Sequence, residues 1–222
     1  MRRVLVTGGT RGIGAAVARA FEAEGAKVVV SSRSSGLRGD VSLDAERIVA
    51  RAAKSLGGLD VLVCCAGVAD PKLWNLAPDA VTPELWDLAQ KTDLWGTFAC
   101  ARAASKRMGR GGAIVTVASI PALVGDSDGL VYAVAKGGVV ALTKMLAVKL
   151  APKIRVNCVA FGSIETGWTD WLSPRQKRKY AAAIPLGRFG RPEEAAEAAL
   201  FLAKNAWTTG QTLVLDGGET LA

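Results

Sequence analysis

The chain has 222 residues, 50% of them hydrophobic, and a formal net charge of +8. This size predicts one globular domain, residues 1–222, with a core large enough to need no disulfide bonds. The sequence contains no histidine, which excludes Ser-His-Asp and Cys-His catalysis and histidine metal sites and leaves proton chemistry to Tyr, Lys, Asp or Glu.

The N-terminus predicts a strand, a glycine-rich turn and a helix. Residues 3–7 form an apolar run, and Ile13, Val17 and Phe21 recur at helical spacing at the start of a helix expected over 15–24. Glycines let a backbone approach a phosphate closely, and the free N–H groups of a helix start favour an anion. This order favours a phosphate-binding turn over a plain turn. The candidate phosphate contacts are Gly8, Thr10, Arg11, Gly12, Ile13 and Gly14.

Apolar β-type runs alternate with helical patterns along the rest of the chain, which predicts an α/β fold with a doubly wound parallel sheet. The expected strands are 28–32, 60–65, 113–119, 154–159 and 213–215, and the expected helices are 44–56, 82–108 and 132–150. Between the second strand and the helix at 44–56 the linking segment is short, and a parallel crossover needs about a dozen residues or more. We therefore expect the crossover helix to be missing there and the edge strand to be lost or vestigial.

The cysteines and the net charge indicate which cellular compartment and which classes of partner to expect. The cysteines lack zinc-ligand spacing, so we expect buried, reduced thiols in a cytoplasmic protein; they are Cys64, Cys65, Cys100 and Cys158. No signal peptide is visible, and we expect no segment long enough to span a membrane. The positive charge favours anionic partners such as a phosphorylated dinucleotide or an acidic carrier protein, with a solubilising surface as the default. Basic residues are scattered, so a nucleic-acid partner is not expected.

Tyr132 and Lys136 carry the strongest chemical signal. Side chains four residues apart share one face of a helix. An ammonium near a phenol favours the phenolate, so we expect the pKa of Tyr132 to be lowered, and such a tyrosine exchanges protons with a carbonyl or alcohol oxygen. Ser119, thirteen residues upstream of Tyr132, would stabilise charge on the same oxygen.

Several separate motifs together resemble the short-chain dehydrogenase/reductase family in order and spacing over nearly the whole chain. They are Thr7-Gly-x-x-x-Gly-Ile-Gly14, Ala66-Gly67, Ser119, Tyr132-x-x-x-Lys136, Asn157 and the tail Gly210-Gln-Thr-Leu-Val-Leu-Asp-Gly-Gly218. Residues 184–194 look like β-ketoacyl-carrier-protein reductases in particular. The resemblance implies a single Rossmann-type domain and an oxidoreductase, with Tyr132 as general acid/base, Lys136 on the nicotinamide ribose and Ser119 on the substrate oxygen.

The resemblance also implies cofactor contacts. Ala66 and Gly67 follow a strand end, Ile164 and Thr166 would contact the carboxamide and phosphates beside Gly162, and Asp40 and Val41 would border the adenine. The end of the second strand reads Val30-Ser31-Ser32-Arg33, without the acid that binds the ribose hydroxyls in NAD enzymes. Arg33 and Arg11 could neutralise a 2′-phosphate, which favours NADP(H) over NAD, although both could be plain surface arginines.

Some positions depart from the family pattern. Asp93 stands where the family has an asparagine that orients a water in a proton relay to the lysine. It either binds water or Lys136, or it has lost the role and pairs elsewhere. Cys64-Cys65 replace two asparagines, and Phe161 replaces a proline. These changes motivate an alternative, a dinucleotide-binding regulator or scaffold with little turnover. A carbon–halogen lyase of related fold is disfavoured, because those relatives lack the glycine-rich loop.

The substrate is expected to be recognised between residues 163 and 185. Trp168, Trp171 and Leu172 could line an apolar pocket, and the basic residues at 175–179 could meet an acidic partner, although a solvated helix face is the better reading. The expected activity is NADPH-dependent reduction of a ketone to a secondary alcohol, with a carrier-bound 3-oxoacyl thioester as one candidate substrate. The resemblance further implies a homotetramer or dimer formed through the helices at 82–108 and 132–150.

Overall fold

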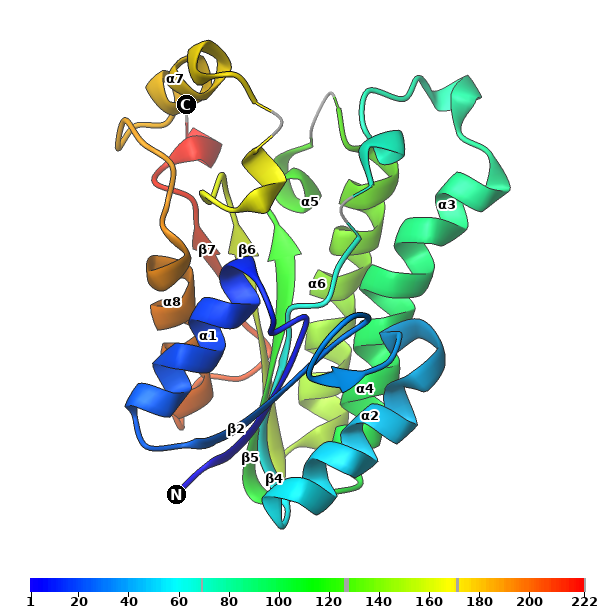
Figure 1. The fold of residues 1–222 in the computed structure, drawn as a ribbon, viewed down its shortest axis with the longest axis vertical. Coiled ribbons are helices and arrows are strands. Elements are labelled where there is room, and N and C mark those ends of the chain that lie inside the picture. Colours follow the sequence, from blue (N-terminus) through cyan, green and yellow to red (C-terminus); the bar gives the residue numbers. More distant parts are fainter. Residues whose placement is uncertain (69, 126–127, 171, 222) are drawn as a thin grey trace.

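The computed structural model describes residues 1–68, 70–125, 128–170 and 172–221. Within these ranges the chain forms a seven-stranded sheet whose neighbouring strands all run parallel, in the order β3-β2-β1-β4-β5-β6-β7. The strands are β1 (Arg3–Thr7), β2 (Lys27–Ser32), β3 (Leu37–Arg38), β4 (Leu59–Cys64), β5 (Met108–Ser119), β6 (Ile154–Phe161) and β7 (Thr212–Leu215). The predicted α/β class with a parallel sheet is confirmed (Figure 1).

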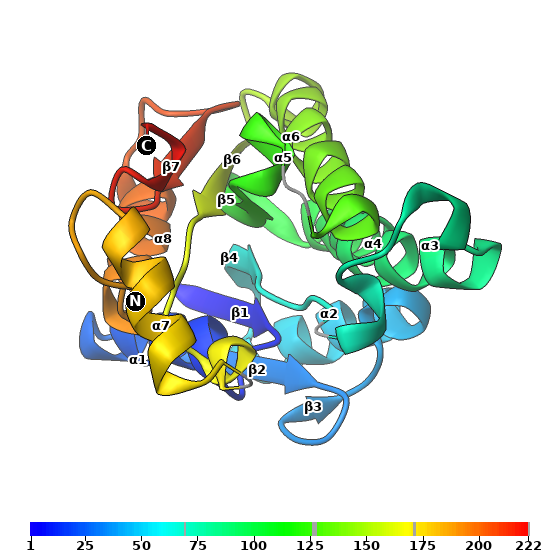
Figure 2. The same cartoon turned by 90° about the horizontal axis from the view of Figure 1, so that it is seen from above.

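Helices cover both faces of the sheet. On one face lie α1 (Gly12–Ala23) and α8 (Pro192–Lys204), and on the other lie α2 (Val41–Leu56), α4 (Gly96–Ser105) and α6 (Leu130–Leu150), as Figure 2 shows. The shorter elements are α3 (Pro83–Ala89), α5 (Pro121–Val124), α7 (Pro174–Ala183), the 3-10 turns η1 (Pro71–Leu73), η2 (Pro78–Ala80), η4 (Gly167–Thr169) and η5 (Glu219–Leu221), and the π-helical segment η3 (Gln90–Trp95).

Two apolar cores, one on each side of the sheet, hold these layers together. Successive strand residues point to opposite faces, so Leu5 packs toward α2 and α4 while its neighbours Val4 and Val6 pack toward α1 and α8. Each fully buried side chain of this kind contributes about 1.5–3 kcal/mol. Burial on both faces explains why these strands are continuous apolar runs rather than alternating ones.

The segment after β2 is shortened as predicted. No helix lies within residues 33–40, and the edge strand β3 has two residues, which pair with Ser31 and Ser32 of β2. The segment is too short for a full parallel crossover. The sheet edge next to β2 is therefore reduced to a turn.

Other boundaries differ from the sequence expectation. The helix expected over 82–108 ends at Ser105, because β5 already begins at Met108, and it is interrupted by η3. The helix α8 was not predicted, although Pro192 and two glutamates form its first turn, which is a typical helix start. These differences move element ends without changing the topology.

The expectation that no segment is long enough to span a membrane was wrong on length. By length and composition α6, with 21 residues, could cross a membrane. In the structure α6 packs on β5 and β6 and is partly buried inside the protein. It is therefore a core helix, whose apolar character is explained by burial against the sheet.

The carboxyl ends of the strands meet at one edge, which is uppermost in Figure 1. The strand order reverses between β1 and β4, because the chain first builds β2 and β3 on one side of β1 and then returns to the other. In open α/β sheets ligands bind outside the carboxyl ends at such a reversal. The glycine-rich turn after β1 and Ser119 at the end of β5 both lie at this edge.

Candidate active site

Ser119 and Tyr132 lie together at the carboxyl edge of the sheet. Ser119 ends β5, and Tyr132 lies in the first turn of α6, which packs against β5. A hydrogen bond joins the two side chains, and the Ser119 hydroxyl also lies 3.3 Å from the Phe161 carbonyl oxygen. Two hydroxyl groups from neighbouring elements, the end of β5 and the start of α6, are thereby held side by side, as a shared substrate oxygen would require.

Lys136 lies one turn further along α6 and is bound directly by Asp93. The Lys136 Nζ atom is 2.8 Å from Asp93 Oδ1 and donates a hydrogen bond of 3.1 Å to the Val117 carbonyl oxygen. It also lies 5.4 Å from the centroid of the Tyr132 ring. Asp93 is fully buried. Of the two readings of Asp93, the structure therefore supports direct binding to Lys136.

The other Asp93 oxygen binds the segment that follows β4. Oδ2 accepts a hydrogen bond of 3.2 Å from the Val68 backbone N–H, and Oδ1 lies 2.8 Å from the position that a Cβ atom would take on Gly67. Asp93 belongs to η3, whose wider turn interrupts the helix between α3 and α4. Single π-helical turns of this kind are frequent at functional sites. The sequence carries no signal that would have predicted this turn.

The expected lowering of the Tyr132 pKa was wrong for the protein alone. Burial raises the pKa of Tyr132, Lys136 lowers it, Asp93 raises it and the hydrogen bond from Ser119 lowers it, and the pKa ends above its ordinary value. Burial disfavours the charged phenolate, and the Asp93 charge opposes the help from Lys136. Tyr132 is therefore protonated at neutral pH.

Lys136 remains charged despite its burial. Burial lowers the pKa of Lys136, but the surrounding groups, chiefly the negative charge of Asp93, raise it by more, so its pKa ends well above the ordinary value. A buried ammonium is stable only when it is paired. Asp93 therefore keeps a positive charge beneath the phenol.

The glycine-rich turn has the geometry of a phosphate site. Gly8 takes φ +67°, and a Cβ atom there would lie 2.7 Å from the Ala66 backbone nitrogen. Arg11 precedes α1 without a side-chain cap, and the first turn of α1 contains no acidic residue. The N–H groups of Gly12, Ile13 and Gly14 therefore start the helix without intrahelical partners, which suits an anion.

The remaining residues predicted in this turn have distinct positions. Thr10 is half-buried within the turn and Arg11 is exposed. Ile13 packs its side chain against the core next to α8, so it can reach a phosphate only through its N–H group. Ala66 N–H donates to the Thr7 hydroxyl at 3.4 Å, which ties the end of β4 to the start of the turn.

In the shortened segment after β2, Arg33 directly follows the strand and is exposed. Asp40 caps α2, because its Oδ1 accepts from the Ser42 N–H at 2.8 Å and from the Ser42 hydroxyl at 2.6 Å. Val41 is buried in the core, so a cofactor could meet it only through its backbone. The two predicted adenine contacts thus have structural roles in helix α2.

The segment after β6 lies opposite the glycine-rich turn. Thr166 carbon atoms lie 3.5 Å from the position of a Cβ atom on Gly12, so the two predicted cofactor segments meet. Ile164 is buried and pairs with Gly190 in an isolated parallel bridge. Glu219 in the C-terminal turn lies close to Gly162 and was not predicted, because nothing in its local sequence indicates a distant partner.

The cysteines at the end of β4 are held as protonated thiols at neutral pH. Burial raises the pKa of the Cys65 thiol to about 12 and that of the Cys64 thiol well above its ordinary value. Thiols with raised pKa are poor nucleophiles. All four cysteines are unpaired, and all but Cys65, which is partly buried, have the buried position that the sequence predicted.

Of the predicted substrate residues, Leu172 is buried. Trp171 lies outside the described residues, and the side chain of Trp168 is likewise not among the described ones. Trp74, in the segment between β4 and α3, contacts Tyr132 and was not predicted, because only the folded chain brings it to the phenol.

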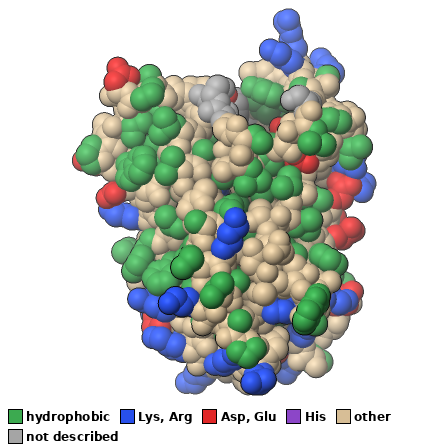
Figure 3. Space-filling view, turned by 180° about the vertical axis from the view of Figure 1, so that it is seen from behind, with side chains coloured by type: hydrophobic (Ala, Val, Ile, Leu, Met, Phe, Trp, Pro, Cys, Tyr) green, Lys and Arg blue, Asp and Glu red, His purple; other side chains and the backbone are tan. Residues whose placement is uncertain are grey.

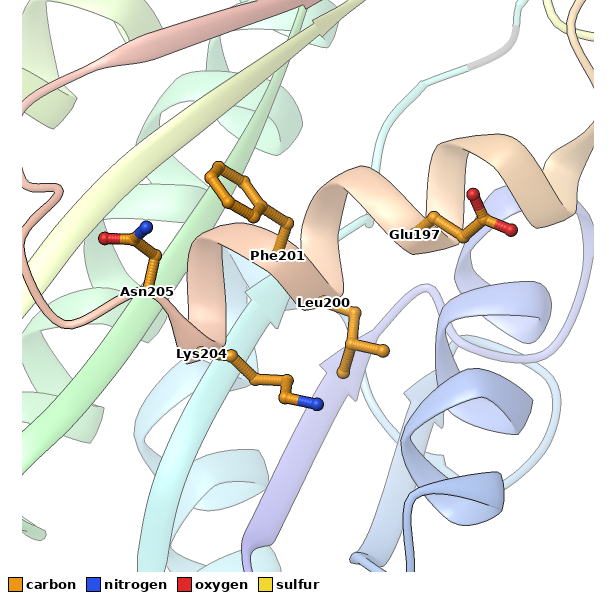
Figure 4. A pocket seen from close by; sticks show the side chains of 5 residues that line it. All are labelled: Glu197, Leu200, Phe201, Lys204 and Asn205. Carbon is orange, nitrogen blue, oxygen red and sulfur yellow. The ribbon is translucent and has the colours of Figure 1, made fainter.

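A shallow hollow of about 410 Å³ lies along α8, away from Tyr132. Figure 4 shows the side chains that line it, Glu197, Leu200, Phe201, Lys204 and Asn205, all from the last turns of α8 and the residue after it. Since α8 and α6 cover opposite faces of the sheet, this hollow has no part in the site.

Comparison with known proteins agrees with this geometry. The family model described as Enoyl-(Acyl carrier protein) reductase matches residues 8–220. The 3-oxoacyl-[acyl-carrier-protein] reductase of Chlamydia pneumoniae is 36% identical over 99% of this chain and 97% of its own length. A crystal structure from Brucella melitensis, described as a short-chain dehydrogenase/reductase and glucose/ribitol dehydrogenase, is 31% identical with a TM-score of 0.92, covering 98% of this chain and 96% of that one.

A further crystal structure, of a small-chain dehydrogenase in complex with NADPH, is 29% identical with a TM-score of 0.89 and covers 100% of both chains. Motifs, sheet topology, site geometry and full-length similarity agree. The chain therefore belongs to the short-chain dehydrogenase/reductase family and is an oxidoreductase acting on CH–OH groups.

Proposed function

We propose that this protein is an NADPH-dependent ketoreductase that converts a ketone to a secondary alcohol. The observation that carries the proposal is the hydrogen-bonded pair of Ser119 and Tyr132 above the Lys136 ammonium, at the same sheet edge as the open start of α1. Full-length similarity to a 3-oxoacyl-[acyl-carrier-protein] reductase supports a ketone in preference to other CH–OH chemistry.

In this mechanism Tyr132 donates a proton to the carbonyl oxygen while the carbonyl carbon is reduced. Ser119 donates a hydrogen bond to the same oxygen and stabilises the charge that develops there. A bound NADPH would supply the hydride to the carbonyl carbon. Lys136 stabilises the phenolate that remains. Because the pKa of Tyr132 is raised, the phenol carries its proton at neutral pH, which supports reduction as the working direction.

The residues present fit a phosphorylated dinucleotide. The uncapped start of α1 offers N–H groups to the pyrophosphate, and Thr166 lies across from Gly12. Arg11 in the glycine-rich turn and Arg33 just after β2 are both exposed, and β2 ends in Ser31 and Ser32 without an acid. Arginines bind a 2′-phosphate through charge, whereas an acidic side chain binds the free 2′-hydroxyl of NAD(H) through a hydrogen bond. This charge pattern supports NADP(H) as the cofactor.

A carrier-bound substrate is the favoured candidate. The helix α7 contains Arg175, Lys177, Arg178 and Lys179, has no acidic residue and lies beyond the carboxyl ends of the strands (Figure 1). An acidic carrier protein would be attracted to it. On the face shown in Figure 3, basic side chains gather along the lower edge and at one upper corner, with apolar patches between them.

We propose a cytoplasmic setting with no nucleic-acid or membrane partner.

We also propose that the protein forms homo-oligomers through α6. Val134, Ala141, Met145 and Val148 recur at helical spacing on the exposed side of α6 and form an apolar stripe. Val148 is 77% exposed and Met145 is 59% exposed. The opposite side of α6 is buried against the sheet. A second copy of this chain would bury the stripe.

The activity test measures NADPH and NADH oxidation with a panel of ketones, an acetoacetyl thioester and an enoyl thioester. We expect the wild type to oxidise NADPH with a ketone and to bind NADPH more tightly than NADH. Loss of the acid catalyst in Tyr132→Phe should reduce the rate by about 100-fold or more. Equal rates in the two proteins would remove Tyr132 from the mechanism, and turnover of the enoyl thioester alone would replace the ketone as substrate.

Two observations favour a second candidate, a dinucleotide-binding protein with little turnover. The direct contact between Asp93 and Lys136 and the raised pKa of Tyr132 both oppose formation of a phenolate. Tight NADPH binding without oxidation of any compound in the panel would support this candidate over the ketoreductase.

A further inference from the structure

The segment between β4 and α3 brings an indole onto the phenol of Tyr132. The ring centroids of Trp74 and Tyr132 are 5.2 Å apart, with an angle of 50° between the ring planes. This is the separation and tilt of a favourable aromatic pair. Trp74 is half-buried and Tyr132 is 8% exposed. The indole therefore covers part of the residue that would donate the proton.

Residues on both sides of Trp74 hold the indole in place. Leu73 is 1% exposed and packs with Val131 and Ala135 of α6. On the other side, the Asn75 N–H donates a hydrogen bond of 2.8 Å to the Asp128 carbonyl oxygen. Trp74 is thus anchored at both neighbours against the start of α6.

A glycine makes room for the ring. A Cβ atom on Gly129, the residue just before α6, would lie 2.6 Å from a carbon of the Trp74 six-membered ring. Any side chain at that position would displace the indole. Anchors and close approach together make the indole a fixed wall rather than a mobile side chain.

We propose that Trp74 is a specificity-determining residue, an apolar wall that selects carbonyl substrates with a flat or ring-shaped apolar group beside the carbonyl. The inference rests on the proposed ketone reduction. A substrate oxygen within hydrogen-bond reach of the Tyr132 hydroxyl, about 2.6–3.2 Å, brings the carbonyl substituents to the edge of the paired rings. An apolar ring gains contact with the indole there, whereas a polar substituent loses hydration without a partner.

The test compares two ketones of different size. Wild type, Trp74→Ala and Trp74→Phe are assayed with NADPH and either cyclohexanone or the fused-ring ketone 2-decalone. Trp74→Ala should lose about tenfold in kcat/KM for 2-decalone, mainly through KM, and change by less than about threefold for cyclohexanone, because only the second ring of the larger ketone buries its CH₂ groups against the indole. Trp74→Phe should lie between. Trp86→Ala, an exposed tryptophan on α3, is the matched control and should leave both values unchanged.

The outcomes distinguish failure of the specificity role of Trp74 from failure of the proposed ketone reduction. Equal losses for both ketones would mean that Trp74 only orients Tyr132, and unchanged values would mean that it contacts no substrate; either result overturns the inference. If the wild type reduces no ketone, the proposed function fails. Contact between Trp74 and an apolar ring is then tested separately, by titrating the protein with 2-naphthol and following the quenching of tryptophan fluorescence. Quenching that persists in Trp86→Phe and is lost in Trp74→Phe supports the wall, and identical curves overturn it.

Discussion

Asp93 changes the electrostatics of Tyr132 and Lys136, the proposed catalytic pair. Its carboxylate lies 2.8 Å from the Lys136 ammonium inside the protein, where charges interact more strongly than in water. The same carboxylate raises the pKa of Tyr132 and of Lys136. Asp93 is therefore a positioning residue that acts on the phenol through Lys136 and through its own field.

We expect Asp93→Asn to shift the pH dependence of alcohol oxidation to lower pH. Oxidation needs the phenolate as base, so its rate rises with pH through the pKa of Tyr132. Removing the Asp93 charge removes an influence that raises this pKa, so the acidic limb of kcat/KM should move down in pH. The Asn side chain can still accept from the Val68 N–H. Asp79→Asn, an exposed carboxylate in η2, is the control. A limb that stays in place or moves up would refute the assignment.

At the scale of elements, the C-terminal turn η5 holds the segment that follows β6. Glu219 accepts hydrogen bonds from the Ser163 N–H at 2.8 Å and from the Ser163 hydroxyl at 2.9 Å. On its other side this segment is paired with Gly190, whose N–H donates to the Ser163 carbonyl oxygen at 2.9 Å. The segment that faces the glycine-rich turn is thus fixed from two directions.

We expect Glu219→Gln to weaken cofactor binding with little change in kcat. The amide keeps one acceptor and turns an NH₂ group toward Ser163, so one charge-assisted hydrogen bond is lost, a change on the order of 1.5–3 kcal/mol. Only part of this free energy is lost from NADPH binding, because Glu219 acts on the cofactor segment and not on NADPH itself. The Kd for NADPH, measured by fluorescence titration, should therefore rise about three- to tenfold. Glu197→Gln, an exposed glutamate on α8, should bind NADPH like the wild type. An unchanged Kd in Glu219→Gln would show that the turn does not position the cofactor segment.

At the scale of the whole molecule, α6 joins the candidate active site to the proposed interface. Its buried side carries Tyr132 and Lys136, and its exposed side carries the apolar stripe of Val134, Ala141, Met145 and Val148. A helix that is apolar on both sides is typical of burial on both sides. Contact with a second copy would complete that burial and steady the helix that holds the catalytic pair.

We expect Met145→Asp combined with Val148→Asp to dissociate the oligomer. Two carboxylates in the middle of an apolar contact would be buried without partners, which is strongly unfavourable. Light scattering coupled to size-exclusion chromatography should give a multiple of the chain mass for the wild type and a single chain mass for the double variant. Leu43→Asp on α2, another exposed apolar residue, should leave the mass unchanged. A monomeric wild type would remove α6 as an interface.

Local patterns in the sequence were enough to predict the class of fold and the placement of Tyr132 and Lys136 on one helix. Apolar periodicity predicted the strands of the parallel sheet, the length of segment 33–41 predicted the vestigial β3, and the spacing of Tyr132 and Lys136 predicted a shared helix face. These features depend on residues that are close in the chain, so propensity and spacing determine them. The α8 helix and the end of α4 show that boundaries are less well determined.

The tertiary structure alone decided the charge state and the neighbours of the site. Asp93 meets Lys136 from a different helical segment, Glu219 meets Ser163 across 56 residues, and Trp74 reaches Tyr132 from the segment after β4. The direction of the Tyr132 pKa shift also depended on folding, because burial outweighs the attraction of a nearby ammonium. Both the distances between remote residues and the loss of water around a charge arise only when the chain is packed.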